Sequence, residues 1–408
     1  MIRSRAIMAA IIMTASALLP LPAASQTAAP PAGLDEVVAV ALRNNPELVQ
    51  ARLRADSAHA EQRIARGLAN PTLTVAPGNP FQYAVAQPLD IGPNRLYRTR
   101  AAGQGLSATR LDVANTTREV LFAVRQGFLD LLLAEAVRGV AAEQDTIVRQ
   151  LLQSDSLRFR DGDLALRELS TTELQFAHAD ANLARAEAGV RASRINLQLR
   201  MGVQHPDPAF RASGTLDYRP VELPLDSLQT IALLARPDAG ATRARVDQSR
   251  SLASLANSLL VPVPALTGVY QSEPFPSGSR YALGVSFSVP ILNWFGGERE
   301  RATAGLRAAE VSSQQTVAQI EGDVVAAADN FRAAGTLAAR YASGLLDKAR
   351  ATLDMQRYAY EHGSASLLDL LNAINGFGDT QTDYFNALHD YWVAAYAIDH
   401  AVGRDLVP

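Results

Sequence analysis

The chain has 408 residues, of which 48% are hydrophobic, so it is long enough to bury a large core. Its formal net charge is −3 and 19% of its residues are charged, which gives neither the basic surface that nucleic acid binding needs nor an acidic tail. The chain has no cysteine, which excludes disulfides, thiolate metal sites and a lipid-modified N-terminal cysteine.

Residues 1–25 have the order of a secretory signal peptide. Arg3 and Arg5 precede an apolar run over 6–19, and prolines and small residues follow up to Ser25. A buried helix or a membrane anchor is the alternative, but the apolar run is short for a bilayer. We therefore predict an exported protein of the periplasm, the outer membrane or the medium.

After this segment, two stretches of the sequence are similar to each other. LDEVVAVALRNNPEL at 34–48 and LDSLQTIALLARPDA at 225–239 align without a gap. The pairs that match in this register are Leu34/Leu225, Asp35/Asp226, Ala41/Ala232, Leu42/Leu233, Pro46/Pro237, Arg52/Arg243, Arg54/Arg245 and Pro71/Pro262. Later matches are Gly162/Gly363, Leu169/Leu370 and Gly202/Gly403. The pattern predicts two structural repeats, 26–221 and 222–408, rather than solenoid units.

Each repeat is predicted to contain one β-hairpin, at about 71–90 and at about 262–290. Bulky residues alternate with small or polar residues along 81–89 and 281–289. A soluble sandwich could use the same alternation, but two hairpins alone do not build one. We favour strands that face lipid, with Trp294 in an interfacial aromatic belt.

Long helices are predicted over 95–159 and 298–360, which contain no proline. Apolar residues step by three and four along them, at Leu121, Val124, Phe128, Leu131 and Ala134, and at Phe331, Ala334, Ala338, Tyr341 and Leu345. Glycine turns follow at Gly162 and Gly363, and helices return over 164–201 and 366–402. The four strands are fewer than the eight of the smallest closed membrane barrels, so several copies must share one barrel.

These features together resemble the TolC-type outer-membrane efflux proteins, in particular the branch that serves heavy-metal and drug exporters of the resistance-nodulation-division type. The resemblance covers 34–404 and includes the G-x-x-S-L-L-D turn at 363–369. It implies a mainly α fold with a small β part: long antiparallel helical hairpins that form a periplasmic α-barrel in a homotrimer, topped by a 12-stranded outer-membrane β-barrel with four strands per chain. The implied function is a passive exit duct fed by an inner-membrane pump and a periplasmic adaptor protein.

The resemblance also implies site residues. Those expected to contact the adaptor at the hairpin tips are Arg158, Gly162, Leu169, Gly363, Ser366, Asp369 and Leu370. Helix capping and coiled-coil packing are the alternative roles for them. Asp354 matches a carboxylate at the periplasmic entrance, where a ring of carboxylates would bind cations. Arg357 departs from an acidic ring, and a solvated surface carboxylate is the alternative for Asp354.

The sequence contains no set of residues that is typical of an enzyme active site. The six histidines are scattered, without H-E-x-x-H or a glycine-rich phosphate loop, and His389 and His400 are expected to serve packing or the surface. We predict no catalysis, no metal site and no cofactor. The alternatives are a soluble periplasmic coiled-coil adaptor or spacer protein and, less favoured, an exported enzyme.

Overall fold

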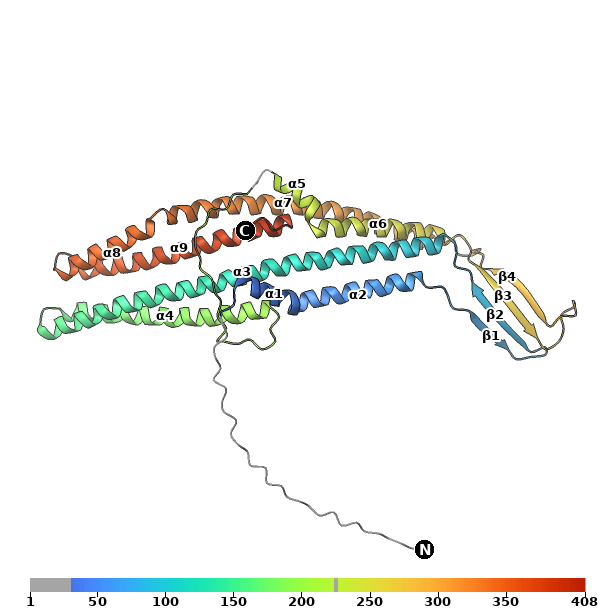
Figure 1. Ribbon diagram of the computed structural model, residues 1–408, viewed down its shortest axis with the longest axis horizontal. Coiled ribbons are helices and arrows are strands. Elements are labelled where there is room, and N and C mark those ends of the chain that lie inside the picture. Colours follow the sequence, from blue (N-terminus) through green and yellow to red (C-terminus); the bar gives the residue numbers. More distant parts are fainter. Residues whose placement is uncertain (1–30, 224–226, 408) are drawn as a thin grey trace, which may run out of the picture.

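A computed structural model describes residues 31–223 and 227–407. The predicted signal peptide and two members of the repeat, Leu225 and Asp226, lie outside these described residues. The described chain is elongated and mainly helical, with a small sheet at one end (Figure 1). The predicted mainly α class with long helical hairpins and a small β part is confirmed.

Nine helices form in the described residues. They are α1 (Leu34–Asn44), α2 (Pro46–Arg66), α3 (Pro93–Asp161), α4 (Leu166–Arg200), α5 (Leu228–Ala235), α6 (Pro237–Ser258), α7 (Gly296–Ala342), α8 (Leu345–Glu361) and α9 (Leu367–Val402). Proline begins α2, α3 and α6, where its missing N–H costs no hydrogen bond. With 69 residues, α3 extends for about 100 Å.

The predicted uninterrupted helix over 298–360 is wrong at one point. Helix α7 ends at Ala342 and α8 begins at Leu345. Between them Gly344 has φ +99°, a left-handed conformation that glycine adopts without strain. The Ser343 hydroxyl donates to the Arg340 carbonyl oxygen at 2.7 Å. A serine and glycine pair is a common cause of helix breaks, and here it lets α8 follow a different direction from α7.

The four strands form one antiparallel sheet. Strands β1 (Thr72–Ala76), β2 (Gln82–Pro88), β3 (Pro264–Gln271) and β4 (Tyr281–Phe287) lie in the order β1-β2-β3-β4. The two predicted hairpins are joined by pairing of β2 with β3, which sets Val85 opposite Gly268. Within the described residues, β1 and β4 each pair on one side only, so both edges of the sheet are open.

The register divides the side chains between two unlike faces. One face is bulky and apolar, with Leu73, Val75, Tyr83, Val85, Leu266, Tyr270, Tyr281, Leu283 and Val285. The other is small or polar, with Thr72, Thr74, Ala84, Ala86, Thr267, Ala282, Gly284 and Ser286. Leu283 is 86% exposed, and no described element covers the apolar face. Such a face is typical of a strand set against lipid.

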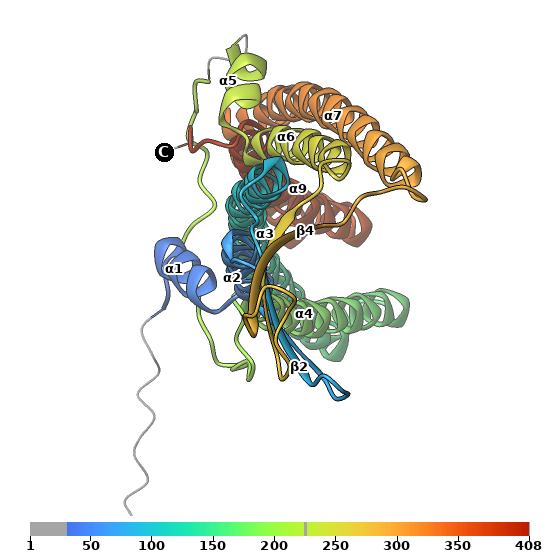
Figure 2. The same cartoon turned by 90° about the vertical axis from the view of Figure 1, so that its right-hand side faces the viewer.

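The helices form one curved layer with two halves. Near the sheet, α2, α3, α6 and α7 lie side by side in this order, and in the far half the order is α4, α3, α9 and α8 (Figures 1 and 2). Helices α1 and α5 lie on the same side of the layer (Figure 2). The two far ends of the layer are the turns between α3 and α4 and between α8 and α9.

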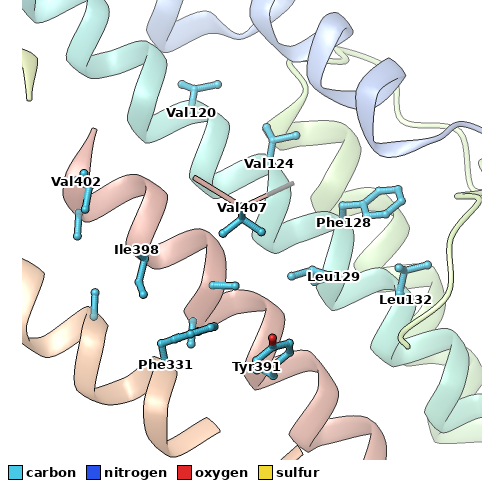
Figure 3. Packing of buried hydrophobic residues seen from close by; sticks show 14 of the residues in the cluster. Val120, Val124, Phe128, Leu129, Leu132, Phe331, Tyr391, Ile398, Val402 and Val407 are labelled. Atoms are coloured by element: carbon cyan, nitrogen blue, oxygen red, sulfur yellow. The ribbon is translucent and has the colours of Figure 1, made fainter. Parts of the chain in front are cut away.

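The main hydrophobic core lies at the middle of the layer. It contains Val124 and Leu131 of α3 and Ile398 of α9, which are fully buried. Figure 3 shows how these helices interlock around Tyr391. The Tyr391 hydroxyl donates to the Arg219 carbonyl oxygen at 2.8 Å and accepts from the Val221 N–H at 2.9 Å. The segment that connects the two repeats is thereby fixed to this core, from which both ends of the molecule project.

Candidate functional site: the two hairpin tips

The two tips are built by the same turn. Gly162 ends α3 with φ +86°, and Gly363 follows α8 with φ +70°. In both turns the residue after the glycine donates its N–H to the carbonyl oxygen of the residue five positions earlier. These bonds run from Asp163 to Arg158 and from Ser364 to Ala359, each at 2.8 Å. This arrangement satisfies helix-end carbonyls and needs a left-handed residue, which explains both glycines.

The helices that return from the tips begin differently. Ser366 and Asp369 form a capping box, in which the Asp369 N–H donates to Ser366 Oγ at 3.2 Å and the Ser366 N–H donates to the carboxylate at 3.1 Å. Hydrogen bonds from Ser366 lower the pKa of Asp369. Ala165 occupies the corresponding place before α4 and has no capping side chain. The second tip is therefore more firmly ordered at its N-cap.

Two of the residues expected at the adaptor contact lie inside the hairpins. Leu169 is 8% exposed and Leu370 is 3% exposed. Leu370 belongs to a second hydrophobic cluster, which also contains Leu353, Ile374 and Phe377. Packing, the alternative role named for both leucines, accounts for these positions.

Each tip instead exposes three large apolar side chains that sequence reasoning missed. Tip patch 1 consists of Leu157, Phe159 and Leu166, which are 54%, 40% and 63% exposed. Tip patch 2 consists of Met355, Tyr358 and Leu368, which are 64%, 64% and 66% exposed. The available signal was that these residues fall off the apolar stripe that packs the helices. Several exposed apolar side chains near one end of the molecule favour a protein contact at that end.

A buried polar cluster connects the two tips. Asp155 of α3 is fully buried and accepts hydrogen bonds from Thr172 Oγ1 of α4 at 2.7 Å and from the Tyr360 hydroxyl of α8 at 2.9 Å. Burial, and then the hydrogen bond to Asp155, raise the pKa of Tyr360 to about 12. Arg158 lies with its guanidinium carbon 5.3 Å from the centre of the Tyr360 ring. We call Asp155, Thr172, Tyr360 and Arg158 the Asp155 cluster, of which only Arg158 was predicted from the sequence.

Asp354 lies on the exposed surface of α8, beside a cavity of about 210 Å³ between α3, α8 and α9. It makes no hydrogen bond or ion pair with any residue that the structure describes. Arginines one turn away on each side reach α3: Arg350 pairs with Glu143 at 3.1 Å, and Arg357 donates to Gln150 Oε1 at 3.5 Å. The carboxylate is thus free, but it lies between two cations.

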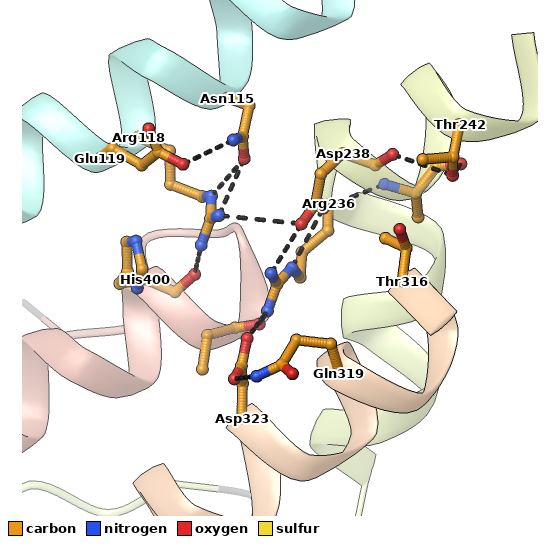
Figure 4. Close-up of polar contacts among 12 residues, drawn as sticks. Asn115, Arg118, Glu119, Arg236, Asp238, Thr242, Thr316, Gln319, Asp323 and His400 are labelled. Carbon is orange, nitrogen blue, oxygen red and sulfur yellow. Dashed lines mark hydrogen bonds and ion pairs between the residues drawn. The ribbon is translucent and has the colours of Figure 1, made fainter. Parts of the chain in front are cut away.

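A polar network at the middle of the molecule holds the helices of the second repeat together (Figure 4). Arg236, between α5 and α6, is 6% exposed and pairs with Asp238 at 2.6 Å and with Asp323 of α7 at 2.9 Å. It also donates to the Ala401 carbonyl oxygen of α9 at 3.2 Å. Burial, and then the nearby arginines, lower the pKa of His400 to about 4. The network joins α6, α7 and α9, Arg118 of α3 comes within 4.0 Å of the Asp238 carboxylate, and His400 is left neutral.

No group of three or more histidine, aspartate or glutamate side chains that could hold a metal ion is found in residues 31–223 and 227–407. Over the same residues, no helix is both long and apolar enough to cross a membrane.

Comparison with known proteins finds similarity to outer membrane efflux proteins. A family model described as outer membrane efflux protein matches residues 228–404. The cobalt-zinc-cadmium resistance protein CzcC of Cupriavidus metallidurans is 23% identical over 393 residues, which cover 94% of this chain and 93% of that protein. Outer membrane protein TolC of Vibrio cholerae is 23% identical, with 91% of this chain and 90% of TolC covered.

The fold agrees with these relatives. The crystal structure of the Campylobacter jejuni CmeC outer membrane channel matches 91% of this chain and 85% of its own, with a TM-score of 0.76 at 18% identity. The overall fold of this chain therefore has a counterpart in a solved channel. The chain is therefore similar to outer membrane efflux proteins, through the family model over residues 228–404 and through these relatives over most of its length.

Proposed function

We propose that this chain is the outer-membrane channel of a tripartite efflux system. It provides a passive exit duct across the outer membrane and the periplasm for substrates that an inner-membrane pump and a periplasmic adaptor protein deliver. The observation that carries the proposal is the sheet with one bare apolar face and two open edges, at the end of a helical layer about 100 Å long. A soluble spacer protein has no use for such a sheet.

The proposed assembly is a homotrimer. Three copies joined at the open edges of β1 and β4 give a closed barrel of 12 strands, in which every backbone group is paired as a bilayer requires. Helices α2 and α7, at the two borders of the layer, carry exposed apolar residues that a neighbouring copy would cover: Leu53, Ile64, Val311 and Val325. The signal peptide over 1–25 would direct the chain to export.

The division into repeats 26–221 and 222–408 is part of the proposal. Arg52 of α2 donates to the Leu42 carbonyl oxygen at 3.0 Å, and Arg243 of α6 donates to the Leu233 carbonyl oxygen at 3.1 Å. These contacts occupy corresponding places in the two halves. In a trimer, such duplication would present six similar tips to the adaptor.

The adaptor would contact the tips. Of the residues named from the sequence, Arg158, Gly162, Gly363, Ser366 and Asp369 lie at the turns themselves, and the two tip patches add apolar area next to them. Asp354, on the free surface of α8, would contribute a carboxylate from each copy to a constriction at the periplasmic entrance.

Charging the tip patches is expected to uncouple the channel from its partner. The double variant Leu157→Arg, Tyr358→Arg places a charge in each patch, and desolvating a charge at an interface is costly. We expect export to fall to the level of a deletion strain while the protein remains in the outer membrane. The matched control is Leu157→Met, Tyr358→Phe, which keeps both patches apolar. Normal export by the arginine variant would exclude the patches as a contact.

The experiment that tests the function is deletion of the gene with complementation. We expect lower tolerance of toxic compounds, measured over cobalt, zinc, cadmium, dyes and antibiotics, because CzcC is named for resistance to the first three. Cell fractionation is the accompanying measurement, with recovery in the outer membrane and release only by detergent expected. Recovery in the soluble periplasmic fraction would favour the adaptor or spacer alternative, and unchanged tolerance in a strain without a second homologue would contradict an efflux role.

A further inference from the structure

Helices α3 and α9 join the two halves of the chain along a seam that contains several polar contacts. Gln381 of α9 donates to Glu143 of α3 at 2.8 Å, and Arg125 of α3 pairs with Asp399 of α9 at 3.4 Å. Between these two contacts, His389 of α9 lies 2.9 Å from Asp130 of α3. We call the contacts between α3 and α9 the seam. Histidine is the side chain whose charge ordinarily changes near neutral pH.

Both ring nitrogens of His389 face carboxylates. Nε2 lies 2.9 Å from Asp130 Oδ1, and Nδ1 lies 3.1 Å from Asp390 Oδ1. A neutral imidazole has a single N–H, so its other nitrogen would set a lone pair against a carboxylate oxygen. Only the protonated ring donates to both partners. The side chain of His389 is 14% exposed, so little solvent reaches it to replace a lost partner.

The charged groups around His389 come from three helices. They are Asp130 of α3, Asp390 of α9 itself and, behind Asp130, Arg200 of α4, which lies 3.9 Å from the Asp130 carboxylate. Burial lowers the pKa of His389, but the hydrogen bonds to Asp130 and Asp390 raise it by more, so that the pKa lies above its ordinary value of 6.5. Asp130 is thus shared between cations on both sides of α3.

We propose that His389 is a pH-dependent clamp across the seam, firm when the imidazole carries a proton and weaker when it does not. Because protonation is favoured in the folded chain, the clamp contributes its full stability below about pH 6.5 and loses it as the pH rises through the folded-state pKa. In the proposed channel the seam lies in the periplasm, so the physiological meaning of the clamp rests on the proposed function. Its existence does not.

Hydrogen exchange on the purified full chain in detergent tests the clamp. At about pH 8 we expect the amides of 125–135 and 385–395 to exchange roughly two- to fivefold faster than at about pH 6, after correction for intrinsic rates, which is the effect of a part-exposed ion pair. In His389→Gln this excess should vanish, because glutamine does not titrate. His400→Gln is the matched control: with its pKa near 4, His400 stays neutral over the whole window, so the dependence should persist.

Equal protection of the wild type at both pH values, or an undiminished pH dependence in His389→Gln, would overturn the clamp. If that variant does not fold, NMR titration of the histidine rings in the wild type still decides, since a His389 midpoint below 6.5 also overturns it. The exchange measurement needs neither pump nor adaptor. A protein that fails to restore export in cells could still show the clamp, and an active channel could lack it, so the two failures are distinguishable.

Discussion

Replacing Gly202 with alanine is expected to destabilise the chain by more than about 2 kcal/mol. Gly202 ends the turn after α4 with φ +80°, where an alanine is strained. Its new Cβ would also clash with the Asn44 carbonyl oxygen and lie 2.8 Å from Asn45 Cα. Both are backbone atoms, so the break between α1 and α2 would have to move. Thermal unfolding followed by circular dichroism measures the loss.

Substitutions at two other glycines separate the strain of the left-handed backbone from the steric clash. Gly162→Ala has a similar φ of +86° with no atom within 4 Å of the new Cβ, so it should cost only the left-handed backbone term of about 1 kcal/mol. Gly139→Ala, inside α3 with open space around it, should stabilise by about 0.5 to 1 kcal/mol. The close approach would be refuted by a Gly202→Ala variant no less stable than Gly162→Ala.

In the second repeat the backbone also passes close to a glycine after the last helix, but different side chains hold it there. In the first half Asn45 donates to the Arg200 carbonyl oxygen at 2.8 Å, next to Gly202. In the second half Arg236 donates to the Ala401 carbonyl oxygen, next to Gly403. Asn45 also caps α2, whereas Arg236 makes ion pairs. One backbone geometry is therefore held by a neutral cap in one half and by a buried cation in the other.

Removing the Tyr360 hydroxyl is expected to loosen both tips. Tyr360→Phe leaves the fully buried Asp155 with one donor fewer, and a buried polar group that loses a partner costs about 1 to 3 kcal/mol. Because the bond joins α8 to α3, we expect faster hydrogen exchange over 150–175 and 350–366. Overall helix content should change little, since the main core at the middle of the layer is not touched.

The matched control is Tyr358→Phe, two residues earlier. Tyr358 is 64% exposed, and its hydroxyl makes no hydrogen bond with the described residues, so exchange at the tips should stay at the level of the wild type. A double-mutant cycle with Thr172→Val would show whether the two donors to Asp155 act together. Equal exchange in Tyr360→Phe and Tyr358→Phe would mean that the buried hydrogen bond does not hold the tips.

Much of the fold could be predicted because its signals are local. The alternation along 81–89 and 281–289 marks strands, and the glycines at 162 and 363 mark turns. The break at Gly344 was missed because a glycine inside a helical pattern is usually tolerated. Its neighbour Ser343 was the available signal, since such pairs are known points of kinking.

The candidate site was harder to predict than the fold. Gly162 and Gly363 have a local reason for their identity, whereas Asp155 and Tyr360 meet only because the end of α8 comes close to α3 at the tips. No spacing in the sequence encodes that contact. The same holds for Arg236, which precedes α6, and Asp323 of α7, because the whole β3-β4 hairpin separates them in the sequence. Exposure, which separates the tip patches from Leu169 and Leu370, likewise depends on packing between distant segments.

The open edges of β1 and β4 bear on how the protein is made. A single copy released into water would present unpaired peptide groups beside bare leucine, valine and tyrosine side chains, a template for aggregation. In the proposed trimer other copies pair these edges, so the survival of a single copy should depend on how quickly it meets them, and its apparent stability on their concentration. Cells that synthesise it faster than it assembles would be expected to need chaperones, or to lose the surplus to proteolysis.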